Sequence, residues 1–92
     1  MTTPKFLDVH PERDKNTVTI RLFVGGENSQ GVPGTRIIVR TNKVKSFVLA
    51  DTDGRAEHEF TLIPGEHRHI EIELAAFGGQ HIWRETFRGR RL

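Results

Sequence analysis

The five histidines are the side chains of this chain best suited to metal chemistry, because neutral imidazole binds zinc, copper and nickel. His67 and His69 are separated by one residue, which places two side chains on the same side of a strand. A third ligand would come from His58, His81 or Glu71, but no spacing in the chain requires one. We therefore interpret His67 and His69 as surface or partly packed side chains, with a metal site as a weak alternative.

The segment Asp51-Thr-Asp53-Gly54 is similar to the first residues of a calcium-binding loop. Such a loop needs further oxygen ligands and a closing Glu at its twelfth position, where this chain has Leu62. Asp favours turns by bonding back to the backbone, and Gly adopts the positive φ that closes a hairpin. The segment is therefore predicted to be a tight hairpin turn.

Trp83 and Phe87 form the one aromatic pair that resembles a binding platform, and they alternate with Arg84 and Arg88 along a predicted strand. The basic face must meet water, which directs the aromatic face toward the core, although Glu85 lies between the two rings. The alternative is an exposed surface for a protein partner or a sugar, since Trp and Arg are favoured at interfaces.

The net charge of +2 is unevenly distributed along the chain. Residues 84–92 contain Arg84, Arg88, Arg90 and Arg91 against Glu85, a local charge of +3. Residues 1–83 therefore have a net charge of −1. A nucleic-acid interface normally needs many clustered basic residues, so this nearly neutral segment argues against one. We expect residues 88–92 to be a frayed basic tail, which leaves weak nucleic-acid contact through the tail as an alternative function.

Several classes of protein are excluded by what the sequence lacks. The absence of cysteine excludes a disulfide scaffold, a thiolate zinc site and a cysteine nucleophile. No Gly-x-Ser-x-Gly, phosphate-loop or dinucleotide motif occurs, so we expect neither an enzyme nor a cofactor. No apolar run is long enough for a membrane helix, and no secretory signal precedes the first strand. A cytoplasmic location is expected if Met1 is the natural start; otherwise the compartment stays open.

Hydrophobic residues recur with period two, which predicts strands rather than helices. Seven strands are expected, at residues 5–9, 17–24, 36–41, 46–50, 55–62, 69–76 and 81–87. Residues 10–16 are interpreted as a polar connection and residues 25–35 as a loop. Strands at this spacing are typical of a single antiparallel β-sandwich domain over residues 1–92.

Opposite charges recur on two strands expected to be neighbours in an immunoglobulin-like sandwich. Arg36 and Arg40 share the outward face of one strand, and Glu71 and Glu73 share that of the other. Cross-strand ion pairing on a solvated face is the simplest interpretation, and a functional anion site is the alternative.

Three motifs along residues 31–74 resemble a known family. Gly31 to Val39 is similar to G-x-P-x-x-G-x-x-V, Thr52 to Phe60 to T-D-x-x-G-x-a-x-f, and Leu62 to Ile72 to l-x-P-G-x-h-x-i-x-v. These motifs are typical of bacterial immunoglobulin-like and carboxypeptidase-regulatory-like domains. The resemblance implies a seven-stranded immunoglobulin-like (transthyretin-like) sandwich and a non-catalytic module.

The sequence thus favours an interaction or structural accessory module. A partner protein, or a second copy of the chain, would bind through an edge strand, through the loop at residues 25–35, or through the last strand with the tail. The residues expected at that last site are Trp83, Arg84, Phe87, Arg88, Arg90 and Arg91. Binding of carbohydrate or another cell-surface polymer is the alternative, with Trp83 as the candidate aromatic.

Overall fold

The computed structural model describes residues 3–42, 44–75 and 82–91, and nearly all of its regular structure is strand. The strands are β1 (Phe6–Asp14), β2 (Thr17–Gly25), β3 (Arg36–Thr41), β4 (Val44–Leu49), β5 (Arg55–Thr61), β6 (His67–Leu74) and β7 (Ile82–Arg88), with a short 3-10 segment, η1 (Glu27–Ser29), after β2. Every pairing between these strands is antiparallel.

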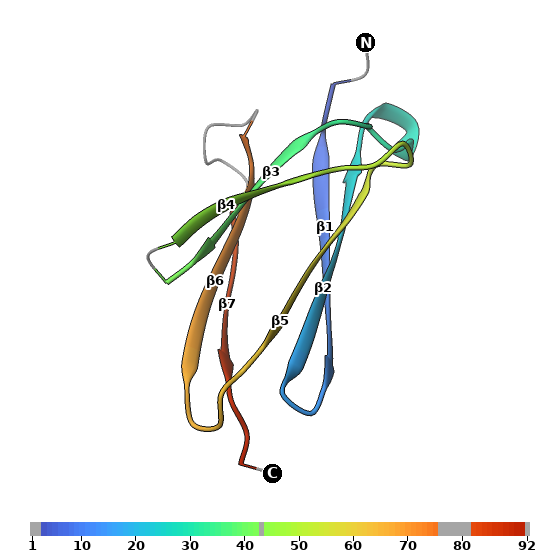
Figure 1. The fold of residues 1–92 in the computed structure, drawn as a ribbon. Coiled ribbons are helices and arrows are strands. Elements are labelled where there is room, and N and C mark those ends of the chain that lie inside the picture. The colour runs from blue at the N-terminus through green and yellow to red at the C-terminus, as the bar shows by residue number, and fades with distance from the viewer. Residues whose placement is uncertain (1–2, 43, 76–81, 92) are drawn as a thin grey trace.

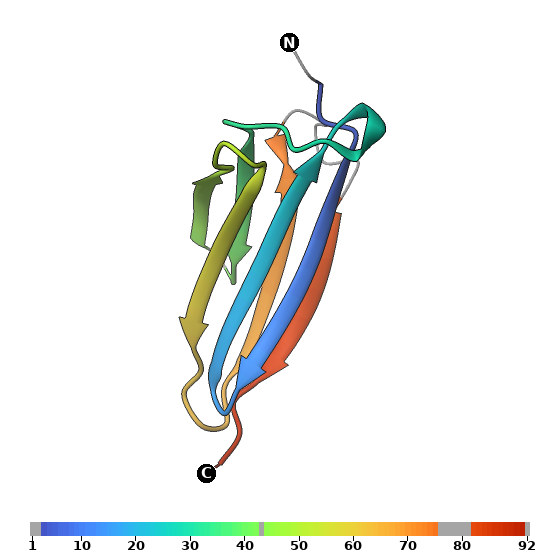
Figure 2. The same cartoon turned by 90° about the vertical axis from the view of Figure 1, so that its right-hand side faces the viewer.

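The strands form two sheets that face each other in an elongated, sandwich-like arrangement (Figure 1). One sheet has the order β1-β2-β5 and the other the order β4-β3-β6-β7. Figure 2 shows the three-stranded sheet in front of the four-stranded sheet, with β4 at the outer left. The prediction of seven antiparallel strands is confirmed.

The core lies between the sheets and follows the period-two pattern of the sequence. Val18, Ile20 and Val24 on β2 are fully buried, while Thr17, Thr19, Arg21 and Phe23, which alternate with the inward residues, are more exposed. From the opposite sheet Ile37, Val39, Ile70, Ile72 and Leu74 complete the layer. Because successive side chains of a strand point to opposite faces, this alternation determines which face of each sheet is buried.

The turn after β4 does not close a hairpin, so that prediction is wrong. Asp51 Oδ1 accepts hydrogen bonds from the backbone N–H groups of Asp53 (2.8 Å) and Arg55 (3.0 Å), and Gly54 has a φ of 78°. The local geometry is therefore the predicted tight turn. It nevertheless carries the chain from one sheet to the other, since β4 pairs with β3 and β5 pairs with β2.

The predicted polar connection at residues 10–16 is also wrong, because β1 runs on to Asp14. Its register with β2 continues from Phe6–Gly25 to Asp14–Thr17, and a two-residue turn at Lys15 and Asn16 joins the strands. The strand tolerates its exposed polar side chains and Pro11 because it lies at a sheet edge, where one row of backbone groups faces water.

The chain after β7 is held by hydrogen bonds rather than frayed, as far as Arg90. Asn16, which is buried, donates from Nδ2 to Arg90 O (2.8 Å) and accepts from Arg90 N (2.8 Å). Arg13 donates from Nη2 to Arg88 O (2.7 Å), and Gly89 O accepts from Gly65 N (2.9 Å). The β1–β2 turn and the turn before β6 therefore tie down the end of the last strand.

Strand ends differ from the predictions by a few residues. β4 begins at Val44, two residues early, and β6 begins at His67 rather than His69. The predicted ends at Ala76 and His81 lie outside the described residues, as does Lys43.

Candidate functional site

The histidine pair predicted as a weak metal site lies at the start of β6. His67 and His69 are both exposed and share one side of the strand, and His69 Nδ1 is 2.6 Å from Thr86 Oγ1 on β7. Within the described ranges, no group of three or more His, Asp or Glu side chains is arranged to hold a metal ion. The hydrogen bond to Thr86 gives His69 a role in cross-strand pairing.

His58 is a half-buried histidine on the inward face of β5. Its ring lies 5.7 Å from the ring of Phe60, and burial, followed by the positive charge of Arg68, lowers the pKa of His58 below 6.5. Burial therefore favours the neutral imidazole, and His58 packs beside Phe60 at the margin of the core.

The aromatic pair on β7 faces the core, as one of the two interpretations predicted. Phe87 is buried and packs edge-on against Phe60, with ring centroids 5.5 Å apart. Trp83 is partly buried against the core, 6.4 Å from Phe87, whereas Glu85 between them is exposed.

The basic residues of the predicted last-strand site lie away from this aromatic face. Arg84, Arg88, Arg90 and Arg91 are all exposed. Arg84 forms an ion pair with Glu71 (3.2 Å) on the outer face of the sheet, and the main chain of Arg90 is bonded to Asn16. The rings and the guanidinium groups therefore do not form one surface.

The predicted cross-strand ion pairing is confirmed in part. β3 and β6 are neighbours, and Arg40 forms an ion pair with Glu73, which is buried although it lies on the outer face. Arg36 instead lies over the ring of Phe47, with 5.2 Å between its Cζ atom and the ring centroid.

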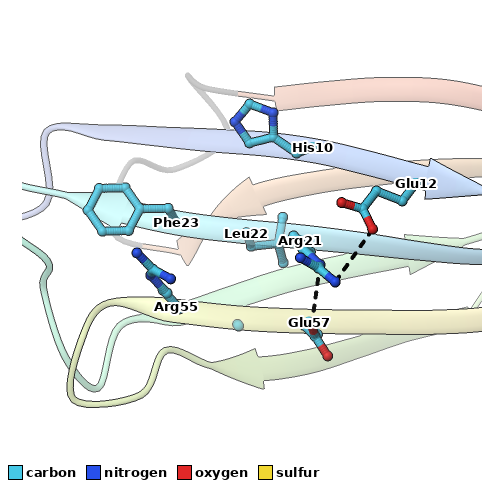
Figure 3. Close-up of a pocket in the computed structure, with 8 residues that line it drawn as sticks. His10, Glu12, Arg21, Leu22, Phe23, Arg55 and Glu57 are labelled. Carbon is cyan, nitrogen blue, oxygen red and sulfur yellow. Dashed lines mark ion pairs between the residues drawn. The ribbon is translucent and has the colours of Figure 1, made fainter.

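A shallow depression of about 530 Å³ lies on the outer face of the three-stranded sheet (Figure 3). Arg21 at its centre makes ion pairs with Glu12 (3.5 Å) and Glu57 (3.6 Å). Phe23 and Arg55 are cross-strand partners at one end, and Phe23 also packs against Phe6 with ring centroids 5.9 Å apart. This surface was not predicted from the sequence, although Phe23 continues the outward series of Thr19 and Arg21.

The edge strand β4 carries the most exposed apolar surface in the described part of the chain. Of the four large hydrophobic side chains that are exposed among the described residues, three lie on β4: Val44 (68%), Phe47 (53%) and Leu49 (63%). The ammonium group of Lys45 and the guanidinium of Arg36 lie 5.5 Å and 5.2 Å from the Phe47 ring centroid. An edge strand was predicted as a possible site, but the sequence alone does not identify β4 as that strand.

The other three edge strands carry features that discourage strand pairing. β1 has Pro11 and exposed acidic residues, β5 alternates exposed charges at Arg55, Glu57 and Glu59, and β7 has Glu85 on its inward side. Charged side chains, prolines and inward-pointing charges are the usual protections of a sheet edge. Lys45 is the single charge on β4, so this edge is the least protected of the four.

Comparisons with protein-family models, with curated proteins and with solved structures find no match for this chain. Among the residues that the structure describes, no helix is long and apolar enough to cross a membrane.

Proposed function

We propose that this chain is a non-catalytic interaction module with an immunoglobulin-like (transthyretin-like) sandwich, and that it binds an extended segment of a partner protein along β4. The fold assignment is supported by the sequence motifs and by the two sheets, in which β3 lies beside β6. The observation that carries the binding function is the exposed apolar edge at Val44, Phe47 and Leu49.

The backbone of β4 is oriented to accept a further strand. Ala50 N donates to Thr35 O (2.9 Å) and Ala50 O accepts from Gly34 N (2.9 Å), so both main-chain groups of Ala50 point toward the chain that leads into β3. Along a strand, residues whose main-chain groups point to one neighbour alternate with residues whose groups point to the other side. Lys45, Phe47 and Leu49 therefore direct their N–H and C=O groups toward the open edge, where none of the described residues pairs with them.

An added strand would gain affinity from main-chain hydrogen bonds and specificity from its side chains. Every second side chain of the added strand would lie on the outer face beside Lys45, Phe47 and Leu49, because side chains alternate along strands. The exposed ring of Phe47 would then be covered by an apolar side chain. This arrangement supplies both backbone pairing and a hydrophobic contact at one edge.

The proposal is tested by selecting unconstrained peptides of about ten residues on the immobilised protein and measuring their binding to two variants. Leu49→Pro removes an outward N–H without removing a bond to β3, whereas Leu49→Thr keeps that N–H. We expect Leu49→Pro to abolish binding and Leu49→Thr to retain it, with both variants folded by amide NMR. Peptides that bind both variants equally, or that shift only amides of β7, would contradict the proposal.

Carbohydrate binding is the second candidate function, and the depression of Figure 3 favours it more than Trp83 does. Phe23 and Arg55 there combine a half-buried ring with a guanidinium that makes no ion pair in the described part of the chain. A glycan panel would shift the amides of β2 and β5, and Phe23→Ala would abolish those shifts. Absence of any shift across the panel removes this candidate.

A further inference from the structure

The hairpin formed by β3 and β4 has a charge unlike that of the rest of the chain. Residues 34–50 contain Arg36, Arg40, Lys43 and Lys45 and no acidic residue, a charge of +4 in a chain whose total is +2. The remaining residues therefore sum to −2. The least protected edge of the molecule is thus also locally cationic.

Two of these cations are available to a ligand at the edge. Arg40 is neutralised by Glu73, but neither Arg36 nor Lys45 forms an ion pair with any described residue. Both lie beside the ring of Phe47 on the outer face, and Arg36 is the cross-strand partner of Leu49. An apolar ring flanked by two unneutralised cations is complementary to a strand in which an apolar residue lies between two acidic ones.

From this charge and geometry we infer that the segment bound by β4 is acidic, with the outer-face pattern acidic–x–apolar–x–acidic. The central apolar side chain lies opposite Phe47, and the flanking carboxylates lie opposite Lys45 and Leu49, within reach of Lys45 and Arg36. Since the spacing of alternate side chains is the same on both strands, this register satisfies all three contacts at once. The inference rests on the proposed function and specifies its partner.

A second copy of the chain is the less favoured occupant of the same edge. Pairing β4 with β4 of another molecule would bring together two hairpins of charge +4 that contain no acidic side chain. Like charges at an interface oppose association. The charge that attracts an acidic segment therefore also opposes self-association.

Three matched peptides test the inference, each with the central sequence X-Thr-Leu-Thr-X, where X is Glu, Gln or Lys. We expect the Glu peptide to bind about five- to tenfold more tightly than the Gln peptide in about 50 mM salt, and the Lys peptide to bind most weakly. Raising the salt to about 500 mM should remove most of the difference, because exposed charges are screened. Binding is followed by fluorescence anisotropy, and the site is mapped by shifts of the β4 amides.

Charge reversal provides the matched control. The double variant Arg36→Glu/Lys45→Glu should reverse the order, so that the Lys peptide binds most tightly. Lys5→Glu, outside the hairpin, changes one charge of the same type and should leave the order unchanged. Both variants are first compared with the parent chain by amide NMR to confirm folding.

The possible failures are distinguishable. Equal binding of the Glu and Gln peptides at β4 would overturn the acidic preference and leave the edge-strand function standing. Failure of all three peptides, while selected peptides sensitive to Leu49→Pro do bind, would also overturn it. A dimer paired through β4 would make the second copy the occupant and overturn the acidic partner. If Leu49→Pro has no effect on any ligand, the proposed function itself fails.

Discussion

At the scale of single residues, polar groups in the interior are satisfied by specific partners. No buried side-chain nitrogen or oxygen in the described ranges lacks a hydrogen bond. Asn16 illustrates this, since its amide pairs with both main-chain groups of Arg90 and accepts from Arg13 (3.0 Å). A side chain in the β1–β2 turn therefore holds the segment that follows β7 in the other sheet.

Replacing Asn16 by Ala should lower the free energy of unfolding by about 1–3 kcal/mol, because it removes the three hydrogen bonds that the Asn16 amide makes with Arg13 and Arg90. Urea unfolding monitored by Trp83 fluorescence measures the change. Asp14→Ala is the control, since Asp14 is an exposed neighbour, and its effect should stay within about 0.5 kcal/mol. Equal effects of the two variants would show that the amide does not hold the C-terminal segment.

His58 should make stability depend on pH near neutrality. Its folded-state pKa is lowered from 6.5, chiefly by burial, so the unfolded state binds a proton more readily. The contribution to stability is present above pH 6.5 and is lost as the pH falls through the folded-state pKa. His58→Gln removes this titration, so the stability of the parent chain relative to the variant should fall between about pH 7.5 and about pH 5. A difference that is constant with pH would contradict the assignment.

At the scale of elements, Gly34 and Gly54 have similar positive φ angles but different surroundings. Comparing them separates the cost of backbone strain from the cost of close packing. Gly34 (φ 73°) has open space where a Cβ would lie, whereas a Cβ on Gly54 (φ 78°) would lie 2.6 Å from Val24 O and 2.7 Å from Val32 N. The turn that crosses between the sheets therefore packs directly against β2 and the segment before β3.

We expect Gly34→Ala to cost about 1–2 kcal/mol, the cost of a left-handed conformation for a residue with a Cβ. Gly54→Ala should cost about 3–5 kcal/mol, because the same strain is joined by contact with backbone atoms that cannot move aside. Thermal unfolding of both variants measures the difference. Similar costs would mean that the turn is not closely packed.

Strands with alternating apolar and polar residues were predicted correctly from the sequence. The predictions failed where the structure of a segment depends on which strand lies beside it in the sheet. β2 and β6 were predicted with the correct inward faces because only one of their faces is apolar. The end of β1 was missed because its polar residues have no strong preference for a strand of their own. They are held in one by pairing with β2, which residue propensities do not predict. The exposure of Phe47 was missed because the alternation of apolar and polar residues does not predict that β4 lies at the edge of its sheet.

At the scale of the whole molecule, the four sheet edges divide into three that are protected and one that is open. The depression of Figure 3 and the ion pairs around Arg21 lie on the three-stranded sheet, whereas the open edge belongs to the other sheet. We therefore expect a monomer in which the positive charge of the hairpin, with Lys45 on β4 itself, opposes pairing of β4 with a second copy.

Lys45→Val should weaken that protection and favour self-association, because β4 itself would then carry no charged side chain. Sedimentation equilibrium over a series of dilutions measures the average mass. Lys5→Val, which removes the same charge outside the hairpin, should remain monomeric. A monomeric Lys45→Val variant would show that another feature protects the edge.

The central claim is that β4 binds a partner by adding a strand, and amide hydrogen exchange tests it most directly. In the free protein the N–H groups of Lys45, Phe47 and Leu49 should exchange faster than those of Ser46 and Val48, which bond to β3. A saturating acidic peptide should slow exchange at the first three amides and leave the other two little changed. Unchanged exchange at Lys45, Phe47 and Leu49 with the peptide bound would contradict the claim.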